Sequence, residues 1–160
     1  MSGEGALRAV FRLEAERTVH IARLGREPGA EQALEDVDDR LKAAMATLEG
    51  EGVAYPLHVV AKHHQLGQED YLILQLSLLP RHGLEVVRAA TAVLGDGEPD
   101  PRLSHAVTLL AEGFDDWLRA AEDLLGLTVF TERLVLATPL PDGDYTLAPS
   151  PAVLELLGLE

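Results

Sequence analysis

The histidines are the first side chains to consider for chemistry, because the chain has no cysteine to supply a thiolate nucleophile or metal ligand. His58, His63 and His64 lie close together in the sequence. A helical zinc site of the HExxH kind needs two histidines four residues apart, and no HExxH occurs. His58 and His63 are five residues apart, which would splay their rings on a helix. We interpret the histidines as solvent-facing or core-edge residues, with an adventitious metal site as the alternative.

Pairs of adjacent acids are the second candidate, as a carboxylate dyad for acid–base catalysis. Neighbouring side chains on a helix point about 100° apart, so adjacent carboxylates do not face one another. Acids in a first helical turn also stabilise the helix dipole. We therefore predict a structural role for the four pairs, which are Asp38-Asp39, Glu69-Asp70, Asp115-Asp116 and Glu122-Asp123.

Phosphate-binding and nucleophile motifs are absent from the sequence. It contains no GxxxxGK[ST], no GxGxxG and no GxSxG, and the glycines at 95 and 97 are flanked by acids that would repel phosphate. The sequence therefore predicts a protein that is not an enzyme, with no catalytic, cofactor-binding or metal-binding residues.

The composition is that of one soluble globular domain spanning residues 1–160, with 47% apolar and 25% charged residues. The net charge of −14 opposes contact with nucleic acid and with anionic lipid. No stretch approaches the length of a membrane span, and the N-terminus lacks the apolar core of a signal peptide. The absence of cysteine fits a cytoplasmic location.

The element that should organise the fold is the run QEDYLILQLSLLP at residues 68–80. It is apolar nearly all round, it has acids at its start, and a proline ends it, which together predict a helix enclosed by others. Apolar periodicity and breaker residues predict further helices over residues 6–25, 30–48, 57–65, 84–94, 102–112, 114–124 and 152–157.

β-Branched residues at 127–139 and the short run at 145–149 flank Asp142-Gly143, which indicates a hairpin. Helices followed by a hairpin are the element order of a winged helix. We therefore predict a mainly α domain with a small β-hairpin. In it, a winged-helix-like core at 56–158 follows an N-terminal helical pair at 1–50.

A winged helix raises the question of DNA binding. The candidate recognition helix, PRLSHAVTLLAEG, is expected to present Arg102, Ser104, His105 and Thr108 outward. One arginine is few for major-groove reading, and the predicted wing carries Asp142 and Asp144. We therefore predict a module that binds another protein, and a DNA-binding regulator is the alternative interpretation.

Aromatic residues supply the candidate anchor for a protein partner. Trp117 is the single tryptophan and has charged neighbours in sequence, a setting in which large aromatics anchor partners. Phe114 and Phe130 are expected in the core. The predicted partner-binding residues are Trp117, Arg102 and His105.

The C-terminal two thirds of the chain resemble a known family. The carrying segments are HQLGQEDYLILQLSLLP, PDPRLSHAVTLLAEG and LVLATPLPDGDYTLAPSPAVLELLG, in that order. This pattern resembles the N-terminal winged-helix region of AAA-type ATPases encoded with phage-tail-like contractile injection systems. In that family the all-apolar helix follows a turn of the form FGLSPFE.

The resemblance implies a substrate- or assembly-recognising module, whose partner is the ATPase core or an injection-system component. The ATPase core expected after Gly158 is missing, so no catalytic residue of the family has a position here. The chain is accordingly expected to be an excised domain or a protein that keeps this domain without the motor, and Leu159-Glu160 could be a cloning scar.

Overall fold

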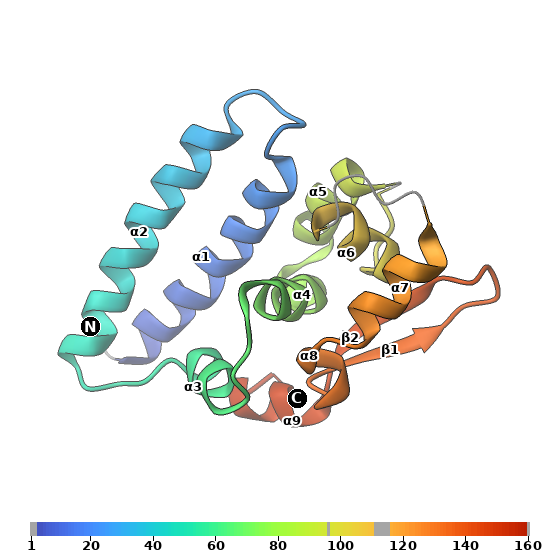
Figure 1. The fold of residues 1–160 in the computed structure, drawn as a ribbon. Coiled ribbons are helices and arrows are strands. Elements are labelled where there is room, and N and C mark those ends of the chain that lie inside the picture. The colour runs from blue at the N-terminus through green and yellow to red at the C-terminus, as the bar shows by residue number, and fades with distance from the viewer. Residues whose placement is uncertain (1–2, 96, 111–115, 160) are drawn as a thin grey trace.

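The computed structural model describes residues 3–95, 97–110 and 116–159 of the chain. It begins with two long helices, α1 (Gly3–Arg23) and α2 (Ala30–Gly50), which form the antiparallel pair on one side of the molecule (Figure 1). The buried residues of α2 are Ala30, Val37 and Leu48, a stripe that packs on α1. The predicted N-terminal helical pair therefore forms, and α1 packs in turn against the helices behind it.

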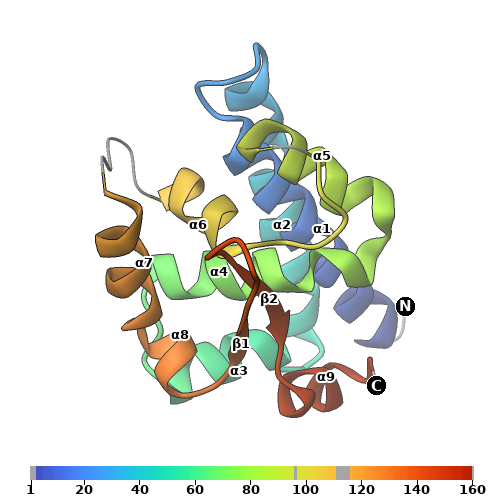
Figure 2. The same cartoon turned by 90° about the vertical axis from the view of Figure 1, so that its right-hand side faces the viewer.

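The central helix is α4 (Gln68–Leu78), preceded by α3 (Pro56–His63) and continued by the short 3₁₀ helix η1 (Leu79–His82). It lies in the middle of the molecule in both views (Figures 1 and 2). Its residues from Ile73 to Leu78 are all buried, and α1, α6, α8 and both strands pack around it. The predicted enclosure of this helix is confirmed.

Between η1 and the hairpin, the described chain forms four helices: α5 (Leu84–Leu94), α6 (Leu103–Leu110), α7 (Trp117–Leu125) and α8 (Thr128–Thr131). The predicted bounds of α5 are confirmed. Helix α6 begins at Leu103 and not at Pro101 or Arg102, because Arg102 makes an isolated bridge with Thr146 of the hairpin. Residues 111–115 lie outside the description, so the predicted core position of Phe114 is untested.

The hairpin consists of β1 (Val135–Pro139) and β2 (Tyr145–Pro149), antiparallel, with Val135 opposite Pro149 and Pro139 opposite Tyr145. Gly143, in the loop between the two strands, has φ of 90°, a conformation that glycine adopts readily. Helix α9 (Pro151–Leu157) follows, and Ser150 caps it by accepting a hydrogen bond from the Val153 amide at 3.3 Å. The prediction of a mainly helical fold with a small hairpin is confirmed.

The expected strand character of residues 127–139 is wrong in its first half. Residues 128–131 form α8, although Thr128, Val129 and Phe130 favour strands locally. The Asp70 carboxylate accepts a hydrogen bond from the Val129 amide at 2.8 Å, which satisfies a donor in the first turn of α8. A partner 59 residues away in sequence thus overrides the local preference.

Buried residues from α1 through α9 belong to one hydrophobic cluster. No helix in the described ranges is both long and apolar enough to cross a bilayer.

Replacing Leu74 or Leu76 by Ala should lower the free energy of unfolding by about 2–5 kcal/mol, because each side chain is fully buried in α4 and would leave a cavity. Urea unfolding measures the loss. Leu118→Ala on α7 is the matched control: its side chain is 74% exposed, so the cost should stay within about 0.5 kcal/mol. Losses below about 1 kcal/mol at both buried leucines would contradict the enclosure of α4.

Candidate functional site

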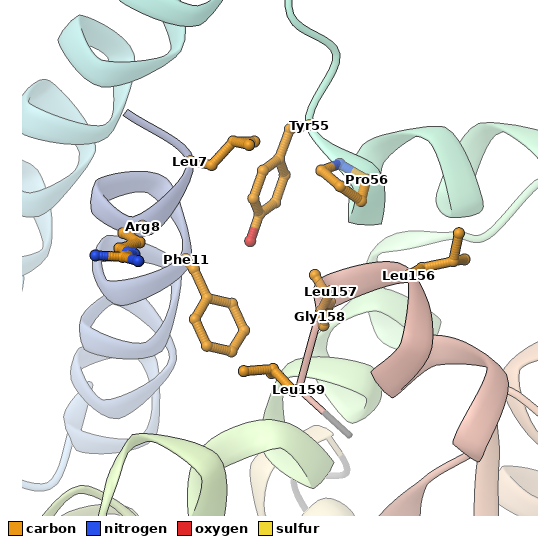
Figure 3. Close-up of a pocket in the computed structure, with 9 residues that line it drawn as sticks. All are labelled: Leu7, Arg8, Phe11, Tyr55, Pro56, Leu156, Leu157, Gly158 and Leu159. Atoms are coloured by element: carbon orange, nitrogen blue, oxygen red, sulfur yellow. The ribbon is translucent and has the colours of Figure 1, made fainter. Parts of the chain in front are cut away.

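An apolar groove lies where the two ends of the described chain meet. Its walls come from the start of α1, the start of α3 and the end of α9 (Figure 3). Helix periodicity places Leu7 and Phe11 of α1 four residues apart, on one face. The groove has a volume of about 430 Å³, and its apolar lining residues are Leu7, Phe11, Tyr55, Pro56, Leu156, Leu157 and Leu159.

The C-terminal wall of the groove presents apolar surface to solvent. Leu156 on α9 is 58% exposed, whereas Val153 of the same helix is buried in the core. Opposite it, Tyr55 projects between Leu7 and Pro56, with its hydroxyl directed toward Phe11 (Figure 3). Large leucines on an exposed rim and aromatic rings inside are the composition of a ligand or peptide site.

His82 extends the groove's aromatic lining into the 3₁₀ helix. Its ring packs on Phe11 with centroids 4.1 Å apart and planes tilted by 30°. Burial, and then the positive charge of Arg12, lowers the pKa of His82 from 6.5 to about 4. Its ring is therefore neutral at pH 7, and it contributes an apolar stacking surface. The next residue back, Arg81, donates to the Leu159 carbonyl oxygen at 3.5 Å and so lies at the C-terminal edge of the groove.

A buried carboxylate ties α1 to α3 and α4. The Glu14 side chain is 6% exposed, and the Tyr71 hydroxyl donates to its Oε1 at 2.6 Å. His58 Nε2 lies 3.7 Å from the same oxygen. The His58 ring also meets the ring of Tyr55 edge-on, with centroids 5.0 Å apart. Glu14, Tyr55, His58 and Tyr71 therefore form one polar cluster beneath the groove.

The two tyrosines of this polar cluster keep their protons and can donate hydrogen bonds. Burial, and next the negative charge of Glu14, raises the pKa of both Tyr55 and Tyr71. Both phenols therefore stay protonated over the physiological range. The hydroxyl of Tyr71 serves Glu14 as a hydrogen-bond donor, which a carboxylate removed from water requires.

Of the predicted partner-binding residues, His105 is placed differently from the prediction. Its outward orientation is wrong: the side chain is 2% exposed, and Nδ1 accepts a hydrogen bond from the Arg102 amide at 2.9 Å. The ring thus satisfies a donor at the start of α6. Arg102 lies beside it but is held by acids, 3.4 Å from Asp142 and 3.8 Å from Glu98.

The acids of the hairpin also contact residues at the start of α6. Asp144 accepts hydrogen bonds from the amide and the hydroxyl of Ser104. Thr108, also expected to point outward, is half-buried and donates its hydroxyl to the Ser104 carbonyl. The polar face expected for reading DNA is therefore largely turned onto the hairpin and onto α6 itself.

Trp117 lies at the start of α7, partly buried and packed against the core, and the neighbouring Leu118 is exposed. Phe130 is also partly buried against the core. The Asp116 carboxylate caps the helix by accepting from the Leu118 amide at 3.1 Å. An anchoring role for Trp117 stays a prediction.

The remaining histidines form no coordination shell. His63 and His64 meet edge-on with ring centroids 5.0 Å apart, and His64 Nδ1 lies 3.7 Å from Glu132. Within the described ranges, no group of three potential ligands could hold a metal ion.

Sequence reasoning missed the groove and the Glu14 cluster. One signal was available for Glu14: Val10, Glu14 and Thr18 recur every four residues, so the acid falls on the buried face of α1. The groove gave no local signal, since residues near 10, 55 and 157 meet only in the folded chain. Comparisons with protein-family models, curated proteins and solved structures find no match to this chain.

Replacing Tyr71 by Phe should lower the free energy of unfolding by about 1–3 kcal/mol, because Glu14 would stay buried without its donor. Chemical denaturation measures the change. Tyr145→Phe is the matched control, because the half-buried Tyr145 hydroxyl has no hydrogen bond within the described residues. Equal losses in the two variants would contradict the proposed tie.

Acidification should destabilise the fold through His82. Between pH 6.5 and about 4 the unfolded chain protonates this histidine while the folded chain does not, so the free energy of unfolding falls as pH falls through that window. Proton NMR of the imidazole should give a midpoint near 4. His82→Gln should remove that signal and flatten this part of the pH profile. A midpoint of 6 or above would contradict the burial of the ring.

Proposed function

We propose that this chain is a non-catalytic, cytoplasmic module that docks another protein. The resemblance to the N-terminal recognition domains of AAA-type ATPases of contractile injection systems suggests its partners. They are an ATPase core or an injection-system component. In this proposal the chain holds its partner and leaves any ATP hydrolysis to a separate domain.

The observation that carries the proposal is the groove between α1, α3 and α9. Its lining is mostly leucine and aromatic, and Leu156 stands exposed on its rim at 58%. Exposing large apolar side chains costs solubility and gives the fold nothing, so a concave apolar surface favours a binding role.

The carboxylates add support, because three that are buried or half-buried serve the fold as hydrogen-bond acceptors. Asp70 accepts hydrogen bonds from the amides of Gly67 and Val129. Glu14 accepts one from the Tyr71 hydroxyl, and Asp144 accepts one from the Ser104 hydroxyl. The alternative, a DNA-binding regulator, gains no support from α6, whose arginine is paired with acids. A salt-dependent mobility shift with duplex DNA separates the two interpretations.

The direct test is a pull-down from the cytoplasm of the native cell with the whole protein as bait. We expect capture of an ATPase core or an injection-system component, and loss of that capture with Leu156→Asp, which places a charge on the exposed rim. Leu118→Asp, an equally exposed change on α7, is the control. Capture that is equal for all three baits would remove the groove as the docking face.

Trp117 provides a second, separable test of where the partner docks. As an anchor, Trp117→Ala should weaken binding of the captured partner by about 2 kcal/mol or more and leave the melting temperature nearly unchanged. Calorimetry of binding and of thermal unfolding measures both quantities on the same variant. A large fall in melting temperature would instead assign Trp117 to the core.

A further inference from the structure

Three arginines gather at the groove in a protein whose net charge is −14. Arg8 belongs to the groove lining. Arg12 lies one helical turn further along α1, beside Phe11, and is close enough to His82 to act on its charge. Arg81 reaches the carbonyl oxygen of Leu159, a lining residue, from the opposite edge. All three side chains are exposed.

Arg12 and Arg81 differ from several other arginines of the described chain, which meet carboxylates of the fold. Such ion pairs join Arg17 to Asp38, Arg23 to Glu27, Arg40 to Glu16, and Arg102 to Glu98 and Asp142. Arg12 and Arg81 have no carboxylate partner among the described residues. Arg8 and Arg12 also stand at i and i+4, where like charges cost a helix a few tenths of a kcal/mol. The Arg8–Arg12 spacing is therefore not one that favours the helix itself.

The charge is also local to this groove. Among the described residues, its lining contains one charged side chain, Arg8, and no acid. By contrast, the hollow beside the α1–α2 loop is lined by Glu27, Glu31 and Glu35. The nearest exposed acid on the α9 wall is Glu155, which precedes Leu156 and is not part of the lining.

From this combination we propose that the groove binds an acidic amphipathic segment of a partner protein, with apolar side chains in the groove and Asp or Glu beside Arg12 and Arg81. This rests on the docking function proposed above and names the chemistry of its partner. Arginine at a rim is well suited to carboxylates, because its planar guanidinium presents donors that match them.

A peptide fits better than a membrane surface. The groove is concave, and its volume of about 430 Å³ suits inserted side chains. An anionic bilayer would meet the arginines but also the long-range field of a protein with charge −14, which repels it. A single acidic segment is small enough to feel mainly the local arginines, since salt screens charges beyond about 8 Å.

The test is a display selection of short random peptides on the whole folded protein. We expect enriched peptides to combine Leu, Ile or Phe with Asp or Glu. A synthetic copy of the most enriched peptide, labelled with fluorescein, then gives dissociation constants by anisotropy. The same peptide with every acid changed to Lys should bind at least about tenfold more weakly, and added salt should weaken the acidic one.

Three variants locate the binding. Leu156→Asp should weaken the peptide at least about tenfold, and Arg12→Glu and Arg81→Glu should each weaken it about five- to tenfold with a smaller salt dependence. The matched controls are Leu118→Asp and Arg119→Glu, exposed changes on α7 that should stay within about twofold. All five positions are exposed, so each variant should keep the wild-type melting temperature, which is checked first.

The outcomes separate this proposal from the docking function. Acidic peptides that bind all variants equally would overturn the groove assignment and leave docking in place. Basic or neutral peptides that depend on Leu156 would overturn the charge assignment. No enrichment at all would overturn the segment proposal, while the pull-down still tests docking. If the protein binds phosphatidylserine vesicles and Leu156→Asp abolishes that binding, the peptide proposal is overturned and the groove is a membrane-binding site.

Discussion

The structure depends on the burial of α4. In a helix enclosed by other elements, each polar group left without a partner carries the cost of lost hydration. The Asp70 carboxylate is paired by two hydrogen bonds that it accepts, one from the Gly67 amide just before the helix and one from the Val129 amide in α8. The Tyr71 hydroxyl is paired with Glu14 of α1. The position of α8 and the attachment of α1 both follow from the polar start of one buried helix.

The acidic side chains fall into two groups, those that accept hydrogen bonds within the fold and those that face solvent. The carboxylates of Glu14, Asp70 and Asp144 accept hydrogen bonds from neighbouring elements and so hold the fold together. The remaining acids give the molecule a negative field, within which the arginines of the groove stand out. A partner with alternating apolar and acidic side chains would meet local attraction inside a generally repulsive surface, which favours specificity over strong general adhesion.

Local patterns made most of the helices predictable. An apolar stripe and a breaker define α2 and α5, and a run that is apolar nearly all round and ends at a proline defines α4, without reference to the rest of the chain. The misses share one cause. Residues 128–131 and the outward face assigned to His105 were judged on local preference, whereas Asp70 and the Arg102 amide decide them through contacts made in the fold. The groove could not be predicted from local patterns at all, because its walls come from opposite ends of the chain.

That construction bears on how the protein is made. Translation delivers α1 early, and α9 only after every other described element has left the ribosome. Helix α9 contributes only Val153 to the buried residues, so the core around α4 can be largely complete before α9 docks. The groove between α1, α3 and α9 is therefore the last surface to form. Occupancy of it would report that every described element has been synthesised and folded, so a chain whose α9 has not yet emerged from the ribosome would be passed over by the partner.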